Sequence, residues 1–202
     1  MPEGVASARE VRSEVRIAPL PIDERDNATN ELLDKVGPGR DLNLFTTLVR
    51  HQRLFRRWLP LCGGLLSGKL SARDRELLIL RTADRCGAAY EWAHHLVFAA
   101  DAGLTTEEVD RVRDGADADG WTELESALIR SVDELHDECE ISASTWSVLA
   151  AHYDQEQLIE VPMVVGHYHM IAFAARSFGV AIEPAYQADS GCRPLGNERA
   201  SR

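Results

Sequence analysis

The spacing of helix-start and helix-stop signals constrains the fold of this chain more than any other feature. Ser71 and Asp154 are residue types that cap helix N-termini, and Thr105-Thr-Glu-Glu108 has the pattern of a capping box. Glycines recur at helix-length intervals, and Gly37-Pro38-Gly39 is a firm stop signal. This punctuation predicts a chain of helices joined by short loops.

The same signals give approximate bounds for each helix. The predicted helices cover residues 30–36, 44–59, 71–85, 88–102, 105–115, 122–138, 142–152 and 154–179. Pro60 is expected to end the second helix, because proline lacks the backbone N–H that a helix interior uses. Only VPMVV at 161–165 favours a strand, but its neighbours are helical in pattern, and Pro162 suits a first turn or a kink. We therefore predict an all-α domain of about eight helices.

The two ends of the chain differ from its middle. Residues 1–25 are polar and proline-punctuated, which predicts an arm over the surface or over a neighbouring subunit. Residues 26–184 form the predicted helical domain, and residues 185–202 are predicted to be a flexible C-terminal tail. A single domain of this size can bury a core without help from disulfides or metals.

Charge and hydropathy exclude several classes of protein. The chain has 33 acidic and 22 basic side chains and a formal net charge of −11, which disfavours binding to nucleic acid or to an anionic membrane surface. No uninterrupted apolar run approaches 18 residues, and the N-terminal residues lack a signal-peptide core. The four cysteines form no Cys-x-x-Cys and no zinc-ligand spacing. We therefore expect a cytoplasmic protein with free thiols and no nucleic-acid or membrane partner.

The candidate chemistry lies between residues 73 and 104. Glu91 and His95 are one helical turn apart, and a carboxylate in reach of an imidazole orients the ring and raises its pKa. Glu76 precedes an apolar run that would draw its carboxyl group into a dry environment. The alternative for Glu76 is an ordinary ion pair with Arg73, one turn earlier. His94 points about 100° away from His95, toward the rim or another subunit.

Metal binding has weaker support in the sequence. Glu91 with His95, and His167 with His169, could each supply two ligands, but neither pair has the spacing of zinc-protease helices. Residues two apart on a helix also diverge by about 200°. We therefore expect no metal site, although His169 or a neighbour in 166–170 could line the same pocket as His95.

The segment also resembles a known family. The stretch RELLILR, the block Tyr90-Glu91-Trp92-Ala-His-His95 and the following GLTTEEV resemble the carboxymuconolactone decarboxylase family, which shares its fold with the alkylhydroperoxidase D proteins. The resemblance is strongest from about residue 50 to 135, and the later helices fit it in outline to about 180. It implies an alkylhydroperoxidase-D-like helical protomer.

The peroxidase branch of that family has a Glu, a Cys-x-x-Cys and a His. The resemblance places the Glu at Glu76 and the His at His95, whereas the two cysteine positions fall on Ala88 and Glu91. A disulfide-cycling peroxidase needs both an attacking and a resolving sulfur. The sequence therefore argues against thiol peroxidase activity and favours the Tyr-Glu-Trp-x-x-His branch.

The resemblance implies a cofactor-free lyase that acts on an unsaturated lactone or a related carboxylic acid. His95 would transfer the proton, with Glu91 and Glu76 tuning it. The predicted substrate-binding residues are Tyr90, Trp92, Arg81, His94 and His169. For Arg81 the favoured alternative is a salt bridge to Asp84 or to another helix. The partners implied are a small-molecule substrate and further copies of the chain, in a trimer or a hexamer. The alternatives are an isomerase, cyclase or lactone hydrolase using the same acid–base pair, and a non-catalytic small-molecule-binding oligomer.

Overall fold

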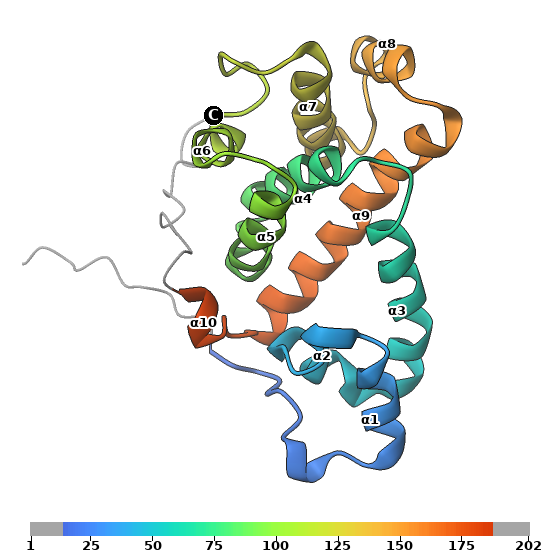
Figure 1. Cartoon of the computed structure of the whole chain (residues 1–202), viewed down its shortest axis with the longest axis vertical. Helices are drawn as coiled ribbons and strands as arrows, with labels where there is room; N and C mark the ends of the chain where they lie inside the picture. Colours follow the sequence, from blue (N-terminus) through green and yellow to red (C-terminus); the bar gives the residue numbers. More distant parts are fainter. Residues whose placement is uncertain (1–13, 188–202) are drawn as a thin grey trace, which may run out of the picture.

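The computed structural model describes residues 14–187, and these residues form helices, turns and loops without a strand (Figure 1). Within this described part, eight helices have eight or more residues, so the predicted all-α class is confirmed. They are α1 (Asn27–Asp34), α3 (Gln52–Leu66), α4 (Ala72–Cys86), α5 (Ala89–Asp101), α6 (Thr106–Asp114), α7 (Glu123–Glu138), α8 (Ala143–His152) and α9 (Gln155–Phe178). The shorter α2 (Asn43–Leu48) and α10 (Pro184–Gln187) and three single-turn 3-10 helices complete the described elements.

Most helix starts follow from the capping residues. The side chains of Ser71, Thr105 and Asp154 each accept a hydrogen bond from a backbone N–H in the first turn. Thr105 with Glu108 forms the predicted reciprocal capping box. Gly87 ends α4 in the left-handed conformation, which costs glycine little because it has no Cβ.

Two prolines lie inside helices. Pro60 was expected to end a helix, but α3 continues through it to Leu66, so that expectation is wrong. Proline removes the hydrogen bond to the carbonyl of Arg56, and Arg56 is exposed, so water can satisfy that oxygen. Pro162 lies in α9, which absorbs the strand-like segment 161–165.

Helix α4 is the centre of the core and packs against α5, α7 and α9 (Figure 1). Four consecutive side chains, Leu77, Leu78, Ile79 and Leu80, are fully buried, so this helix is covered on every side. Each such side chain stabilises the fold by about 1.5–3 kcal/mol. The polar residues Glu76, Arg81 and Thr82, which flank these four positions, are buried as well, and this sets the environment of the candidate site.

Helix α9 is long and apolar enough to cross a membrane by length and composition alone. Of its most apolar window, 44% is buried inside the protein. It also packs against α3, α4, α5, α7 and α8, and Val161, Val164 and Ala172 are buried in the main core. These contacts are those of a core helix in an all-helical fold.

The described part of the N-terminal arm runs along the end of α9. The backbone N–H groups of Arg16 and Ile17 donate to the carbonyl of Phe178. At Gly179 the chain is left-handed, and an added Cβ would lie 2.2 Å from the carbonyl oxygen of Glu14. Only glycine allows the arm to lie so close. Residues 1–13 of the predicted arm and 188–202 of the predicted tail lie outside the described residues, and the division into segments stays a prediction.

Candidate active site

A buried carboxylate–imidazole pair connects α4 to α5. The Nδ1 atom of His95 lies 2.7 Å from Oε2 of Glu76, and the two residues are 8% and 2% exposed. Arg73 does not pair with Glu76, because it donates instead to Glu108 and Glu125. The alternative interpretation of Glu76 as the partner of Arg73 is therefore wrong.

The pairing fixes the chemistry of the His95 ring. Nδ1–H donates to the Glu76 carboxylate, so Nε2 is the nitrogen that can accept or deliver a proton. Glu76 immediately precedes the four fully buried residues of α4, and the packing of α4 on α5 brings it to His95, 19 positions away.

Two aromatic rings frame His95. Tyr168 of α9 meets the His95 ring edge-to-face at 5.0 Å between centroids, and Phe98 of α5 lies at 5.3 Å. Burial raises the pKa of Tyr168 well above its ordinary value, so this phenol stays protonated and can donate a hydrogen bond. Burial likewise raises the pKa of the Cys62 thiol to about 11, which disfavours a thiolate beside the pair.

Glu91 does not contact His95 as the helical spacing predicted. It is 3% exposed, and neither side-chain oxygen has a hydrogen-bond partner in the described part of the chain. Burial raises its pKa to about 7. A spacing of four residues places two side chains on one face, but the nearer carboxylate of Glu76 takes the bond to His95.

His94 belongs to a second carboxylate–imidazole pair. Its Nε2 atom lies 2.7 Å from Oε2 of Glu183, and the Tyr90 hydroxyl donates to the other oxygen of that carboxylate at 2.9 Å. The rings of Tyr90 and Tyr186 stack against His94, each at 4.1 Å between centroids. His94 is 6% exposed, so of the two predicted positions the rim is wrong for the described chain, and a position facing another subunit stays a prediction.

Glu183 is held as a carboxylate in this second pair. Burial raises its pKa, but the contact with His94 and the hydrogen bond from the Asn43 backbone N–H outweigh that effect and leave the pKa below its ordinary value. The pair thus connects α5 to the segment before α10 and to the start of α2.

Two predicted substrate-binding residues contact other parts of the core. Arg81 donates to both carboxylate oxygens of Asp133 and to the carbonyl of Val112, so its guanidinium is already engaged. Trp92 lies in the core under the guanidinium of Arg113, 4.0 Å from the ring centroid. Neither reaches His95, because both face the side of the core that α6 and α7 cover.

His169 also lies away from the Glu76–His95 pair. Its Nε2 atom is 2.9 Å from Nδ1 of His136 on α7, whereas its neighbour Tyr168 faces His95. His167 stacks on Trp58, in a third direction. Adjacent residues on α9 therefore serve three separate environments, as the 100° step of a helix requires.

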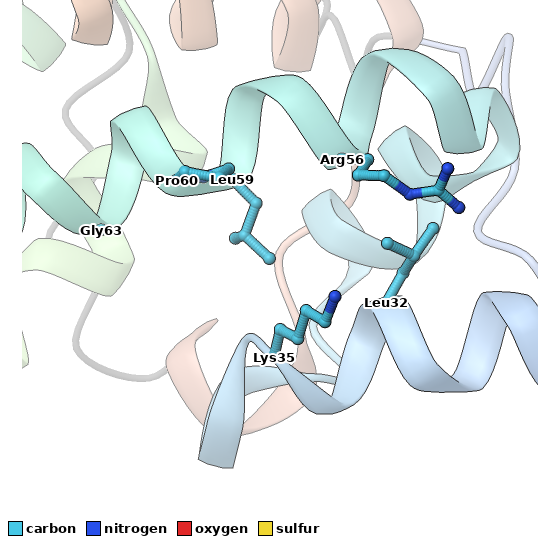
Figure 2. A pocket seen from close by; sticks show the side chains of 6 residues that line it. All are labelled: Leu32, Lys35, Arg56, Leu59, Pro60 and Gly63. Atoms are coloured by element: carbon cyan, nitrogen blue, oxygen red, sulfur yellow. The ribbon is translucent and has the colours of Figure 1, made fainter.

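An open surface hollow lies at the other end of the molecule, between α1 and α3 (Figure 2). It has a volume of about 280 Å³ and is lined by Leu32, Lys35, Arg56, Leu59, Pro60 and Gly63. None of these residues belongs to α4, α5 or α9, the helices that carry the Glu76–His95 pair and Tyr168. The hollow is therefore separate from the candidate active site.

Comparison with known proteins supports the fold and the family resemblance. Residues 52–134 match the model of the carboxymuconolactone decarboxylase family, so the resemblance of the sequence to this family is confirmed over that segment. The segment contains both Glu76 and His95. No curated protein sequence matches the chain.

Solved structures extend the likeness to most of the chain. A cysteine-to-alanine variant of the debrominase Bmp8 in complex with 2,3,4-tribromopyrrole is 16% identical, with a TM-score of 0.74 over 87% of this chain and 96% of that one. An uncharacterised peroxidase-related protein with an alkylhydroperoxidase D core, from Ralstonia eutropha JMP134, is 17% identical, with a TM-score of 0.70 over 84% and 94%. A putative antioxidant defence protein AhpD, ATU0492 from Agrobacterium tumefaciens, is 20% identical, with a TM-score of 0.62 over 67% and 95%. The fold is thus alkylhydroperoxidase-D-like, as predicted.

Sequence reasoning named some site residues and missed others. It nominated Glu76 and His95, which the structure brings into contact, and it singled out the segment that contains Tyr168 without choosing that residue. It missed Glu183, because a lone Glu near the C-terminus carries no motif. Only the position of Glu183 beside His94 and Tyr90 reveals its role.

Proposed function

We propose that the Glu76–His95 pair is the proton-transfer centre of a cofactor-independent enzyme, and that its reaction is decarboxylation of an unsaturated lactone or a related carboxylic acid. The observation that supports this most directly is the 2.7 Å contact between Nδ1 of His95 and the buried carboxylate of Glu76. A ring oriented in this way is suited to general acid–base catalysis. The family match over residues 52–134 supports the choice of a carboxymuconolactone-type substrate.

The proposed reaction balances without a cofactor. The bond between the substrate carbon and its carboxylate breaks, and carbon dioxide leaves. The electron pair passes into the conjugated lactone and generates an enolate-like charge. Nε2–H of His95 then delivers a proton to carbon, and the ring regains its proton from solvent. Glu76 stabilises the protonated ring before the transfer.

An anionic substrate needs a local cation, because the protein as a whole carries a net charge of −11. Arg75 is next to Glu76 on α4, and its charge acts on Tyr168 beside His95. Its buried Nε atom has no hydrogen-bond partner in the described part of the chain. We propose Arg75, in place of Arg81, as the anchor of the substrate carboxylate.

The test is carbon dioxide release from 4-carboxymuconolactone, with loss of the substrate followed by ultraviolet absorbance. We expect turnover by the wild-type protein and a fall in kcat of about 100-fold or more in His95→Ala and Glu76→Gln. His152→Ala is the matched control, because His152 is exposed at the end of α8. Thermal unfolding of each variant confirms that the fold is intact.

Other outcomes would point to the alternatives. Turnover that is insensitive to His95→Ala would overturn the proposed centre. Absence of turnover would reject this substrate and direct the search to isomerisation, cyclisation or hydrolysis of other lactones. If no acid or lactone is turned over but ligands still bind, the chain is a small-molecule-binding oligomer. Thiol peroxidase activity is not proposed, because Ala88 and Glu91 stand at the two cysteine positions.

We also propose that the chain assembles into a cytoplasmic trimer or hexamer. Apolar side chains are exposed on α5 and α9, where a second copy could cover them. They include Val97, Phe98, Met163, Met170 and Phe173. Light scattering of the purified protein measures the assembly, and Phe173→Glu, at a position 63% exposed here, should dissociate it without unfolding the protomer.

A further inference from the structure

Helices α4, α7 and α9 pack against one another (Figure 1), and three side chains that can bind a metal, one from each helix, lie close together. Cys86 is the last residue of α4, His136 lies in the last turn of α7, and His169 lies in the middle of α9. One ligand atom from each of them lies within 4.8 Å of the others. We propose that Cys86, His136 and His169 bind a divalent cation of the zinc type.

The geometry of the two histidines suits a shared metal ion. Nδ1 of His136 and Nε2 of His169 are 2.9 Å apart, so both nitrogens point to the same place. Two imidazoles on a tetrahedral zinc ion hold their nitrogens about 3.3 Å apart, from Zn–N bonds of about 2.0–2.1 Å. A separation of 2.9 Å therefore needs only a small opening to admit the ion.

A second contact orients one of these rings. Nδ1–H of His169 donates to the carbonyl oxygen of Val165 at 2.8 Å, which leaves the lone pair of Nε2 directed at His136. Metal-binding histidines commonly donate their other ring N–H to a carbonyl in this manner, and the contact fixes the tautomer. The ring of His169 is thus already in its ligating form.

Cys86 supplies the ligand that selects the metal. Its side chain is buried in the main core, and the backbone carbonyl of the same residue accepts from Arg176 of α9. A thiolate with two imidazoles favours zinc and similar transition metals over magnesium or calcium, which prefer oxygen. Three protein ligands leave a fourth position for water, as in zinc sites that exchange or activate a ligand.

Binding requires one proton to leave. Burial raises the pKa of Cys86 to about 11, so the group is a thiol near neutral pH, and the metal displaces its proton to solvent as the sulfur–metal bond forms. Because Nε2 of His169 is an acceptor, His136 carries its proton on Nδ1, and that proton moves through solvent to Nε2 as Nδ1 takes the metal. The net release is one proton per ion.

The site is distinct from the Glu76–His95 pair. Cys86 is ten residues beyond Glu76 on the same helix, which corresponds to about 15 Å along its axis. The charged groups around Cys86 form a balanced set, since Arg85 pairs with Asp133 and Asp137 while Glu91 and Arg176 lie nearby. The proposal therefore stands whether or not the protein is a decarboxylase.

The experiment uses the full-length, tag-free protein after removal of metals with a chelator. Zinc affinity is measured by competition with a chromogenic chelator, and Co²⁺ serves as the spectroscopic probe. We expect one ion per chain, a thiolate-to-Co²⁺ charge-transfer band, and release of one proton. Cys86→Ala should remove the band and weaken zinc binding by at least about 100-fold.

Matched controls separate this site from adventitious binding. Cys139→Gly removes an exposed thiol at a position whose backbone is already left-handed, and His152→Ala removes an exposed imidazole. Both should bind as the wild type does. His169→Gln tests the site independently if Cys86→Ala fails to fold. A stoichiometry far below one, a Co²⁺ spectrum without a thiolate band, or binding unchanged by both ligand substitutions would overturn the proposal.

Discussion

Two carboxylate–imidazole pairs occupy neighbouring positions on α5, and they are built from different parts of the fold. His95 pairs with Glu76 of α4, next to the buried residues of the main core. His94 pairs with Glu183, which lies close to the C-terminal end of the described chain, just before α10. Both contacts are 2.7 Å long, so distance alone does not distinguish them.

The surroundings of the two pairs give them different roles. Glu183 also accepts from Tyr90 and from the backbone of Asn43, and its pair holds the C-terminal segment against α5 and α2. Within residues 14–187, the Glu76 carboxylate has His95 as its hydrogen-bond partner. We infer that the His94–Glu183 pair is a structural clasp, and that the His95–Glu76 pair is suited to proton transfer.

The most direct test of the different roles of the two pairs is to remove each imidazole in turn. His95→Ala should lower kcat for carbon dioxide release by about 100- to 10,000-fold, because general acid–base catalysis contributes an effect of that size. His94→Ala should leave kcat within about tenfold of wild type, since the clasp does not transfer the proton. Both are measured at saturating 4-carboxymuconolactone, with thermal unfolding as the check on the fold. Equal losses would show that the two pairs act together.

The second largest expected effect is on the free energy of unfolding, and it comes from Glu91, which lies close to both pairs on α5. Its folded-state pKa is about 7, above the ordinary 4.5, so the folded protein retains a proton that the unfolded chain has released. The free energy of unfolding should therefore fall as the pH rises from about 4.5 to about 7, by up to about 3 kcal/mol. Glu91→Gln should remove this loss and be more stable than wild type at pH 8, as measured by urea unfolding.

A matched control makes that result specific. Glu140→Gln changes the same chemical group at an exposed position and should shift the free energy of unfolding equally at all pH values. A Glu91→Gln effect that does not vary with pH would contradict the assignment of the raised pKa to this carboxyl group.

Removing the carboxylate of the clasp should have the opposite dependence on pH. Glu183→Gln should cost about 1–2 kcal/mol in the free energy of unfolding at neutral pH, because the contact with His94 and the hydrogen bond from Tyr90 lose their charged partner. The pKa of Glu183 is lowered in the folded state, so this stabilisation is present above the ordinary carboxyl pKa and is lost as the pH falls through the lowered value. Urea unfolding from pH 7 to pH 3 measures the change, and a cost that persists at pH 3 would count against the clasp.

The smallest expected effect concerns the ring stacked on the clasp. Tyr186→Ala should lower the free energy of unfolding by about 0.5–1.5 kcal/mol, because the stacked contact with His94 is lost. Turnover should stay at the wild-type rate, since Tyr186 does not contact His95. A fall in kcat with unchanged stability would place this ring at the active site instead.

The sequence predicted the helices well because their signals are local. A capping side chain such as Thr105 or Asp154 bonds a backbone N–H three residues away, so the signal and its effect lie in one short segment. The exception at Pro60 is instructive. A helix tolerates a proline when water hydrogen-bonds to the unpaired carbonyl and the rest of the helix is stabilised by packing.

The side-chain pairs could not be predicted in the same way. The spacing of Glu91 and His95 predicted a local pair. Instead, His95 contacts a residue 19 positions earlier, Glu76, and His94 contacts one 89 positions later, Glu183. The three residues of the proposed metal site are separated by 50 and 33 positions, and no ligand spacing marks them. Helix periodicity determines which side chains share a face, but the packing of the helices determines which residues that face contacts.

By itself, the sequence determined the all-helical fold, most of the helix ends and the family resemblance, and it nominated Glu76 and His95 as candidate site residues. These properties depend on hydrogen bonds and hydrophobic patterns within a turn or two of chain, or on motifs of contiguous residues. Only the tertiary structure decided which carboxylate each imidazole meets, which parts of the core Arg81 and Trp92 contact, and where Cys86 joins two histidines. Those outcomes depend on how α4, α5, α7 and α9 pack, and packing brings together residues that are distant in the sequence.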